Sequence, residues 1–116
     1  MKPVTKGLMI GMELARFEKI ADASEYQTLK EQIEKLVSSS RVDIERIVSN
    51  AHVTPIGTWY NQDKNEFVSV LKGHAVVRFE DETVKIKKGD WIIIPAHKKH
   101  RVEKTARKTI WLTVFY

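Results

Sequence analysis

The chain has 116 residues, a formal net charge of +5 and no cysteine. This length suits one domain with a core that needs no disulfides, and the lack of cysteine excludes thiolate metal sites and a cysteine nucleophile. Glu13 interrupts the apolar stretch at residues 7–12, which is too short for a signal peptide or a membrane span. We therefore expect a cytoplasmic protein without a membrane partner.

The N-terminal part, residues 1–40, is expected to form a strand and helix extension to a barrel made by residues 41–116. Residues 9–17 are rich in apolar side chains and suit an edge strand that two subunits could exchange. A helix is predicted over residues 24–37, because Ser24 and Gln27 fit a capping box and apolar residues follow at three- and four-residue spacing. These apolar residues are Tyr26, Leu29, Ile33, Leu36 and Val37. A helix of this length is marginal alone, so we expect it to pack outside the barrel or on a second subunit.

Eight strands are predicted in the rest of the chain, separated by turn signals such as Gly73 and Gly89. They cover residues 41–48, 56–60, 66–71, 75–80, 83–86, 91–94, 100–103 and 108–115. Short strands at this spacing indicate a mainly β protein, an antiparallel sandwich or barrel. A closed jelly roll is an economical way to hide sheet edges at this size.

Positive charge is concentrated in residues 85–108, which contain nine lysines and arginines and only two acidic residues. Such a cluster could attract phosphates or nucleic acid. Lysines on exposed strands and loops also protect sheet edges from pairing. Because no RNA-binding aromatic motif or recognition-helix pattern accompanies the cluster, we favour a solvated rim and expect no nucleic-acid partner.

Two spaced motifs lie in the strand region. One consists of Gly89, Pro95 six positions later and His100 five positions after that, with His97 between them. It resembles the second signature motif of the cupin superfamily, except that His97 stands where the family has glycine. The resemblance implies a small single-domain cupin, which is a jelly-roll β-barrel, here with the N-terminal helix packed outside it. Small cupins commonly dimerise, so the resemblance also implies a homodimer.

The other motif is Glu66 followed seven positions later by Gly73. It resembles the end of the first cupin motif. That motif also carries two histidines, separated by one residue, shortly before the glutamate, and this chain has none there. Their places belong either to Tyr60 and Gln62, which we favour, or to Trp59 and Asn61.

The resemblance implies a metal site in the barrel. Cupins typically use three histidines and one glutamate, and the residues left here are His100 and Glu66 as ligands, with Gln62 and His97 as less certain contributors. This mixed set of nitrogen and oxygen ligands admits Zn, Ni, Mn or Fe(II). The cofactor expected from the resemblance is therefore a divalent transition metal ion.

The function favoured by these residues is a metal-dependent enzyme that acts on a small polar or anionic metabolite. Tyr60 or His97 would donate or accept the proton, and the basic segment would attract an anionic ligand. The alternative is a non-catalytic small-molecule-binding or sensor protein with the same pocket. The sequence contains neither a nucleophile elbow of the Gly-x-Ser-x-Gly type nor a glycine-rich phosphate loop before a helix.

Overall fold

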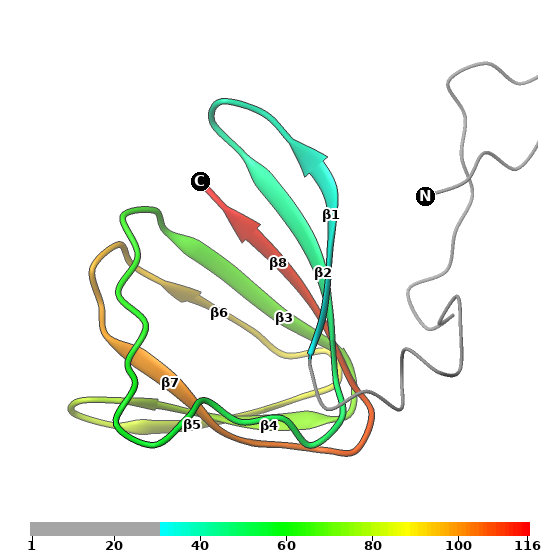
Figure 1. The fold of residues 1–116 in the computed structure, drawn as a ribbon, viewed down its shortest axis with the longest axis vertical. Coiled ribbons are helices and arrows are strands. Elements are labelled where there is room, and N and C mark those ends of the chain that lie inside the picture. The colour runs from blue at the N-terminus through cyan, green and yellow to red at the C-terminus, as the bar shows by residue number, and fades with distance from the viewer. Residues whose placement is uncertain (1–30) are drawn as a thin grey trace, which may run out of the picture.

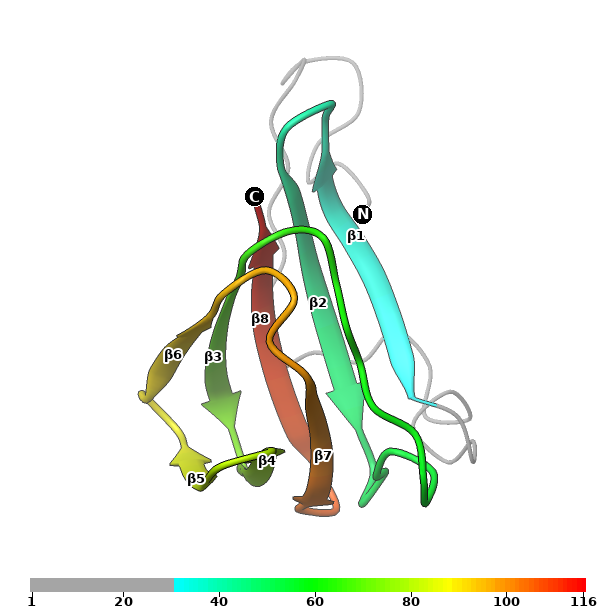
Figure 2. The ribbon, with the colours of Figure 1, turned by 90° about the vertical axis from the view of Figure 1, so that its left-hand side faces the viewer.

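The computed structural model describes residues 31–116, which form eight strands in two antiparallel sheets. The strands are β1 (Gln32–Ser38), β2 (Asp43–Ser49), β3 (Glu66–Lys72), β4 (His74–Phe79), β5 (Thr83–Lys87), β6 (Trp91–Ile94), β7 (His100–Thr105) and β8 (Thr109–Phe115). The larger sheet has the order β1-β2-β8-β3-β6 and the smaller one β5-β4-β7 (Figure 1). Figure 2 shows the five strands of the larger sheet side by side in this order, with β7 in front of them.

The core lies where the two sheets face one another. In β3 the side chains of Glu66, Val68 and Val70 are buried while those between them are half-buried, as expected when alternate residues face opposite sides of a sheet. The buried apolar cluster draws on both sheets and contains Val68, Val70, Ala75, Val77, Phe79, Ile86, Ile94 and Trp111. Each fully buried Val or Ile contributes about 1.5–3 kcal/mol of hydrophobic free energy, so this cluster is the main stabilising element.

The expected two-sheet jelly roll is confirmed, and seven of the eight predicted strands are present with small shifts at their ends. The strand predicted at residues 56–60 is wrong. Gly57 has φ +83°, and the Thr58 N–H donates to the Pro55 carbonyl at 3.0 Å, so the chain turns there. Only Tyr60 pairs like a strand residue, in an isolated bridge to His100.

The helix predicted over residues 24–37 is also wrong for the part that the structure describes, because β1 is an antiparallel strand paired with β2. Ile33 lies opposite Ile47 and Val37 lies opposite Ile44, with a register shift between Lys35 and Val37. That bulge puts Ile33 and Val37 on opposite faces, so their four-residue spacing does not mark a helical stripe. Residues 24–30 of the predicted helix and the edge strand expected at residues 9–17 lie outside the described residues.

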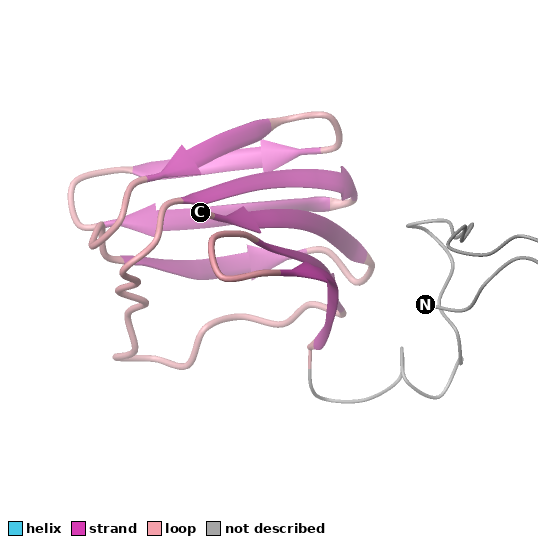
Figure 3. Cartoon of the chain, turned by 90° about the horizontal axis from the view of Figure 1, so that it is seen from above, coloured by secondary structure: helices cyan, strands magenta, loops and turns pink. Residues whose placement is uncertain are grey.

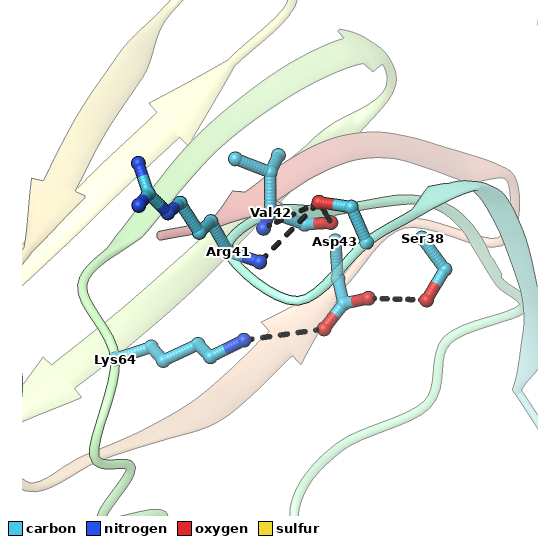
Figure 4. A network of polar contacts seen from close by, with 6 residues as sticks. Ser38, Arg41, Val42, Asp43 and Lys64 are labelled. Carbon is cyan, nitrogen blue, oxygen red and sulfur yellow. Dashed lines mark hydrogen bonds and ion pairs between the residues drawn. The ribbon is translucent and has the colours of Figure 1, made fainter.

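The hairpin of β1 and β2 is tied to the segment that precedes β3. The Ser38 hydroxyl donates to the Asp43 carboxylate at 2.7 Å, and the Lys64 ammonium lies 3.6 Å from the same carboxylate (Figure 4). These contacts lower the pKa of Asp43, with the Ser38 hydrogen bond as the largest cause. The expected division of the chain between residues 40 and 41 stays a prediction; β1 lies on the N-terminal side of it.

Figure 3 shows that the regular elements of residues 31–116 are strands joined by loops. Within this range there is no helix with the length and apolar character needed to span a membrane.

Candidate functional site

A cavity of about 380 Å³ opens between the two sheets. Its apolar wall includes Val68, Val77, Ile94, Val102 and Trp111, which come from five different strands. Its volume falls in the range of roughly 300–1,000 Å³ that small-molecule sites occupy. The cavity is therefore large enough for a metabolite and is walled mainly by the side chains that form the core.

Glu66 and His100 form the polar centre of this cavity. Glu66 begins β3 and points inward because it shares a face with Val68 and Val70. His100 begins β7, and its backbone exchanges hydrogen bonds of 2.8 and 3.1 Å with Tyr60. The His100 Nε2 atom lies 3.5 Å from the Glu66 Oε1 atom, and the two residues are only 6% and 8% exposed. The two residues singled out by the motif spacing are thus brought together.

The protonation of His100 is set by its two neighbours. Its Nδ1 atom lies 3.0 Å from the Lys98 carbonyl, which can only accept, so Nδ1 carries the hydrogen. In the neutral imidazole the Nε2 lone pair therefore faces Glu66. Burial lowers the pKa of His100, but the Glu66 carboxylate beside it and the Lys98 carbonyl outweigh this effect, so the pKa is raised overall.

The Glu66/His100 pair fits two ligands of one metal ion. Glu66 Oε1 is buried without a hydrogen-bond partner among residues 31–116, and its 3.5 Å distance to Nε2 exceeds the roughly 2.7–3.2 Å of a good N–H···O bond. Two ligands of a tetrahedral zinc ion, each about 2.0–2.2 Å from the metal, lie roughly 3.4 Å apart. The lone pair on Nε2 and the unpartnered carboxylate oxygen are both suited to a cation.

Among the described residues, Glu66 and His100 are the two strong metal ligands at this place. No group of three or more His, Cys, Asp or Glu side chains that could hold a metal is found in residues 31–116. Among the described residues, a further protein ligand would therefore be of another kind, such as an amide or phenol oxygen. The donor set is compatible with a metal but is weaker than the usual three-histidine, one-glutamate set.

Tyr60 and Gln62 line the cavity, whereas Trp59 and Asn61 are not among the described lining residues. The Tyr60 ring lies 5.8 Å from the His100 ring, measured between centroids. The backbone of Gln62 is held in place by its main-chain carbonyl, which accepts a hydrogen bond from the His97 backbone N–H at 2.7 Å. Of the two pairs that the sequence left open, the structure therefore places Tyr60 and Gln62 beside Glu66 and His100.

His97 lies outside the cavity lining and is exposed. Its φ of +66° is in the left-handed region that favours glycine, and it occupies the place where the second motif has glycine. The structure thus gives a conformational reason for the family's glycine here. A role for His97 in metal binding or proton transfer stays a prediction that this position does not favour.

Sequence reasoning missed five polar residues of the cavity. These are Glu31, Glu45, His52, Thr54 and Thr113. Glu45 shares the inward face of β2 with Ile47, and Thr113 shares that of β8 with Trp111. Burial raises the pKa of Glu45, and the carboxylates of Asp43 and Glu66 add to this against the opposing effect of Lys35. The alternating pattern of β2 and β8 was the available signal, but it does not say which face is inward.

The cupin domain family model matches residues 51–115. A solved structure from Ralstonia eutropha JMP134, described provisionally as a mannose-6-phosphate isomerase, is 35% identical, with a TM-score of 0.74 over 76% of this chain and 85% of that one. A cupin superfamily protein from Desulfitobacterium hafniense DCB-2 is 20% identical, with a TM-score of 0.66 over 75% of this chain and 77% of that one.

A third structure, a protein of unknown function from Rhizobium leguminosarum bv. viciae 3841, is 18% identical with a TM-score of 0.66. It covers 90% of this chain, and the match covers 98% of that protein. The second and third structures show likeness of fold alone. A comparison with curated protein sequences found no match. The family model spans more than half of the chain and agrees with the two-sheet fold, so the chain belongs to the cupin family.

Proposed function

We propose that this cupin is a metal-dependent enzyme that acts on a small polar metabolite in the cavity between its sheets. The observation that carries the proposal is the Glu66/His100 pair, in which a buried carboxylate oxygen without a partner faces the Nε2 atom of an imidazole. A buried charge of this kind needs a cation or a hydrogen-bond donor. Its position on the wall of a metabolite-sized cavity supports a functional role.

His100 Nε2 and the Glu66 carboxylate would hold the metal, with the Gln62 side-chain oxygen as the third candidate ligand. Zn, Ni, Mn and Fe(II) all accept such a set. When bound, the metal supplies Lewis-acid polarisation of a substrate oxygen. The Lys98 carbonyl supports this role, because it fixes the hydrogen on Nδ1 and leaves Nε2 free to bind.

Tyr60 is the side chain best placed to exchange a proton with a bound substrate. It lines the cavity and its ring lies beside that of His100, whereas His97 is exposed. The apolar wall includes Val68 and Trp111, and a substrate that fills the cavity against this wall would displace water and so strengthen electrostatic interactions there. Tyr60 would thus act as the general acid or base, and the wall would hold the substrate beside it.

The Ralstonia relative suggests which reaction to try first. It is described as an isomerase of a sugar phosphate, so proton transfer between neighbouring carbons of a sugar is a reasonable class for this chain. The hydroxyl groups of a sugar would find acceptors in Glu66 and Gln62. The phosphate group is a poorer match, because no lysine or arginine is among the described lining residues.

One observation favours the rival function, a non-catalytic binding or sensor protein. Within residues 31–116 the cavity offers only two strong metal ligands close together. Without metal, the Glu66/His100 pair would simply hydrogen-bond a ligand.

Turnover separates the two functions. A ligand found by thermal-shift screening of sugars, amino sugars and hydroxy acids is incubated with the wild type and with Glu66→Gln and His100→Ala. If the protein is an enzyme, the wild type converts the ligand chemically and both variants lose this activity. The circular dichroism spectra of the variants should stay unchanged, which shows that they are folded. Tight binding without conversion after reconstitution with Fe, Ni, Mn and Zn would support the binding protein instead.

A further inference from the structure

The cavity is acidic, although the chain as a whole is basic. Three glutamates line it, Glu31, Glu45 and Glu66, whereas lysine and arginine do not occur among its described lining residues. His52 and His100 are the lining side chains that can become positive. An anionic ligand would therefore face carboxylates inside the cavity, where the lower dielectric strengthens repulsion.

Glu45, Thr113 and Glu66 form one continuous patch on the inner face of the larger sheet. Glu45 on β2 pairs directly with Thr113 on β8, and Thr113 pairs with Val68 on β3, two residues beyond Glu66 on the same face. Figure 2 shows β2, β8 and β3 side by side. Side chains directly opposite in such pairs have Cβ atoms about 4.5–5.5 Å apart. We name these three residues the acidic patch.

Two atoms of the acidic patch lack a hydrogen-bond partner within residues 31–116. They are Thr113 Oγ1 and Glu66 Oε1, in residues that are 1% and 8% exposed. Native proteins satisfy most buried polar side-chain atoms, so two unsatisfied atoms on the same cavity wall point to a missing partner. A ligand group that donates hydrogen bonds would satisfy both atoms, because a carboxylate oxygen can only accept and a hydroxyl oxygen can also accept.

We propose that the acidic patch binds the ammonium and hydroxyl groups of a small organic cation, of the amino-alcohol or amino-sugar class, and that the cavity rejects anions. This rests on the proposed function only in using the same cavity. An ammonium group carries three donors and forms short, charge-assisted bonds to carboxylates. Burial is the main cause of the raised pKa of Glu45, and the charge of Glu66 adds to it against the opposing effect of Lys35, which lies opposite Glu45 on β1.

A bare metal ion is a poorer occupant of the acidic patch than an organic cation. Glu45, Glu66 and His100 all line the cavity, yet no set of three such ligands is close enough for one ion within residues 31–116. An organic ligand can span the distance between Glu45 and Glu66 and can place its hydroxyl groups against Thr113. A metal at the Glu66/His100 pair would leave Glu45 and Thr113 available to such a ligand.

The test uses three six-carbon polyols that differ in one end group. Glucamine carries an ammonium, sorbitol a hydroxyl and gluconate a carboxylate at neutral pH, and mannose 6-phosphate is added as a phosphate ester. Isothermal titration of the full chain should give an affinity for glucamine about tenfold higher than for sorbitol, as a hydrogen bond to a charged group is stronger than a neutral one. Gluconate and mannose 6-phosphate should bind more weakly than sorbitol.

Substitutions then show which residues cause the preference for glucamine over sorbitol. Glu45→Gln should reduce the ratio of glucamine to sorbitol affinity to near one, and Thr113→Val should weaken both polyols. Glu80→Gln removes the same charge from an exposed turn outside the cavity lining and should change neither value. Equal affinities for the three polyols, no measurable binding of glucamine, or a preference that persists in Glu45→Gln would overturn the proposal.

Metal content measured on the same samples separates this inference from the proposed function. A charge preference in protein that takes up no metal even after reconstitution would defeat the metal-dependent enzyme and leave the acidic patch standing. A protein that binds metal but shows no preference for glucamine over sorbitol would defeat the acidic-patch proposal and leave the metal-dependent enzyme standing. Glu45→Gln should keep the metal content of the wild type, because Glu45 is not one of the proposed ligands of a metal bound by Glu66 and His100.

Discussion

His100 and Glu66 control one another's protonation, and this coupling can be measured directly. Glu66 and the Lys98 carbonyl raise the pKa of His100 above its ordinary 6.5 although burial lowers it. In Glu66→Gln the charge is gone, so burial should dominate and the pKa should fall below that of the wild type. Titration of the imidazole protons by NMR in metal-free protein gives both values. An unchanged pKa in the variant would contradict the coupling.

The same shift predicts how stability depends on pH. Because the folded pKa is raised, the proton on His100 stabilises metal-free protein fully below pH 6.5, and this contribution is lost as the pH rises through the raised pKa. Urea unfolding from pH 6 to 9 should therefore show a loss of stability in the wild type that Glu66→Gln lacks. If the free energy of unfolding changed with pH in the same way in both proteins, the interaction between Glu66 and His100 would contribute nothing to stability.

The Thr113 hydroxyl should lower the stability of the ligand-free protein. Its buried hydroxyl lacks a partner within the described residues, and such a group costs about 1–3 kcal/mol. Thr113→Val should therefore raise the free energy of unfolding of the ligand-free protein by about 1 kcal/mol. Thr105→Val is the matched control: the Thr105 hydroxyl donates to the His52 carbonyl at 2.7 Å, so its loss should destabilise by about 1–2 kcal/mol. Equal effects in both variants would contradict this account.

At the residue scale, motif spacing led from the sequence to Glu66, His100, Tyr60 and Gln62, all of which line the cavity. It did not lead to Glu45 or Thr113. Their inward direction depends on the pairing of β2 with β8, which joins residues sixty or more positions apart in the chain. Single-sequence periodicity identifies alternating strands but does not assign their faces or neighbours.

At the scale of elements, the turn between β3 and β4 offers a test of the packing. Gly73 has φ +81°, and a Cβ there would lie 2.5 Å from the Lys108 carbonyl oxygen. Gly89 has φ +90° with nothing within 4 Å of such a Cβ. Gly89→Ala should therefore cost only the left-handed backbone strain of about 1–2 kcal/mol, and Gly73→Ala should cost roughly 1–3 kcal/mol more for the clash. Urea unfolding of both variants compares them, and similar losses would argue against the close approach.

β1 shows where local sequence patterns stop being informative. Ile33, Leu36 and Val37 have helical spacing, but pairing with β2 and the bulge near Val37 decide the structure instead. The strand prediction for residues 56–60 was wrong for a different reason: their side chains favour strands, but the chain turns at Gly57. Strands bounded by clear turn residues on both sides, such as β5 and β6, were predicted well because the turn chemistry fixed their ends.

At the scale of the whole molecule, the homodimer implied by the cupin resemblance stays a prediction. The outer face of the larger sheet carries exposed apolar side chains suited to an interface with a second copy: Trp91 is 58% exposed and stacks on Phe67, and Ile93 is 50% exposed. Sedimentation velocity at micromolar concentration should therefore detect a dimer, which Trp91→Glu should weaken. A wild type that is wholly monomeric would remove the prediction.

The charge of the molecule is divided between its surface and its cavity. The lysines and arginines of residues 85–108 are absent from the described lining residues, whereas three glutamates are present there. The basic segment therefore governs long-range attraction, which salt screens, and the acidic patch governs what is held inside. The expectation of an anionic ligand, which was based on the basic segment at residues 85–108, is thus replaced by a proposal based on the cavity.

Metal content tests the central claim most directly. Elemental analysis of protein purified without chelators should find about one divalent transition metal ion per chain, and His100→Ala should lose it. Protons compete for Nε2, so occupancy should fall as the pH drops through the raised pKa of His100, beginning above the ordinary 6.5. A metal content near zero in the wild type, even after reconstitution with Fe, Ni, Mn and Zn, would contradict the claim.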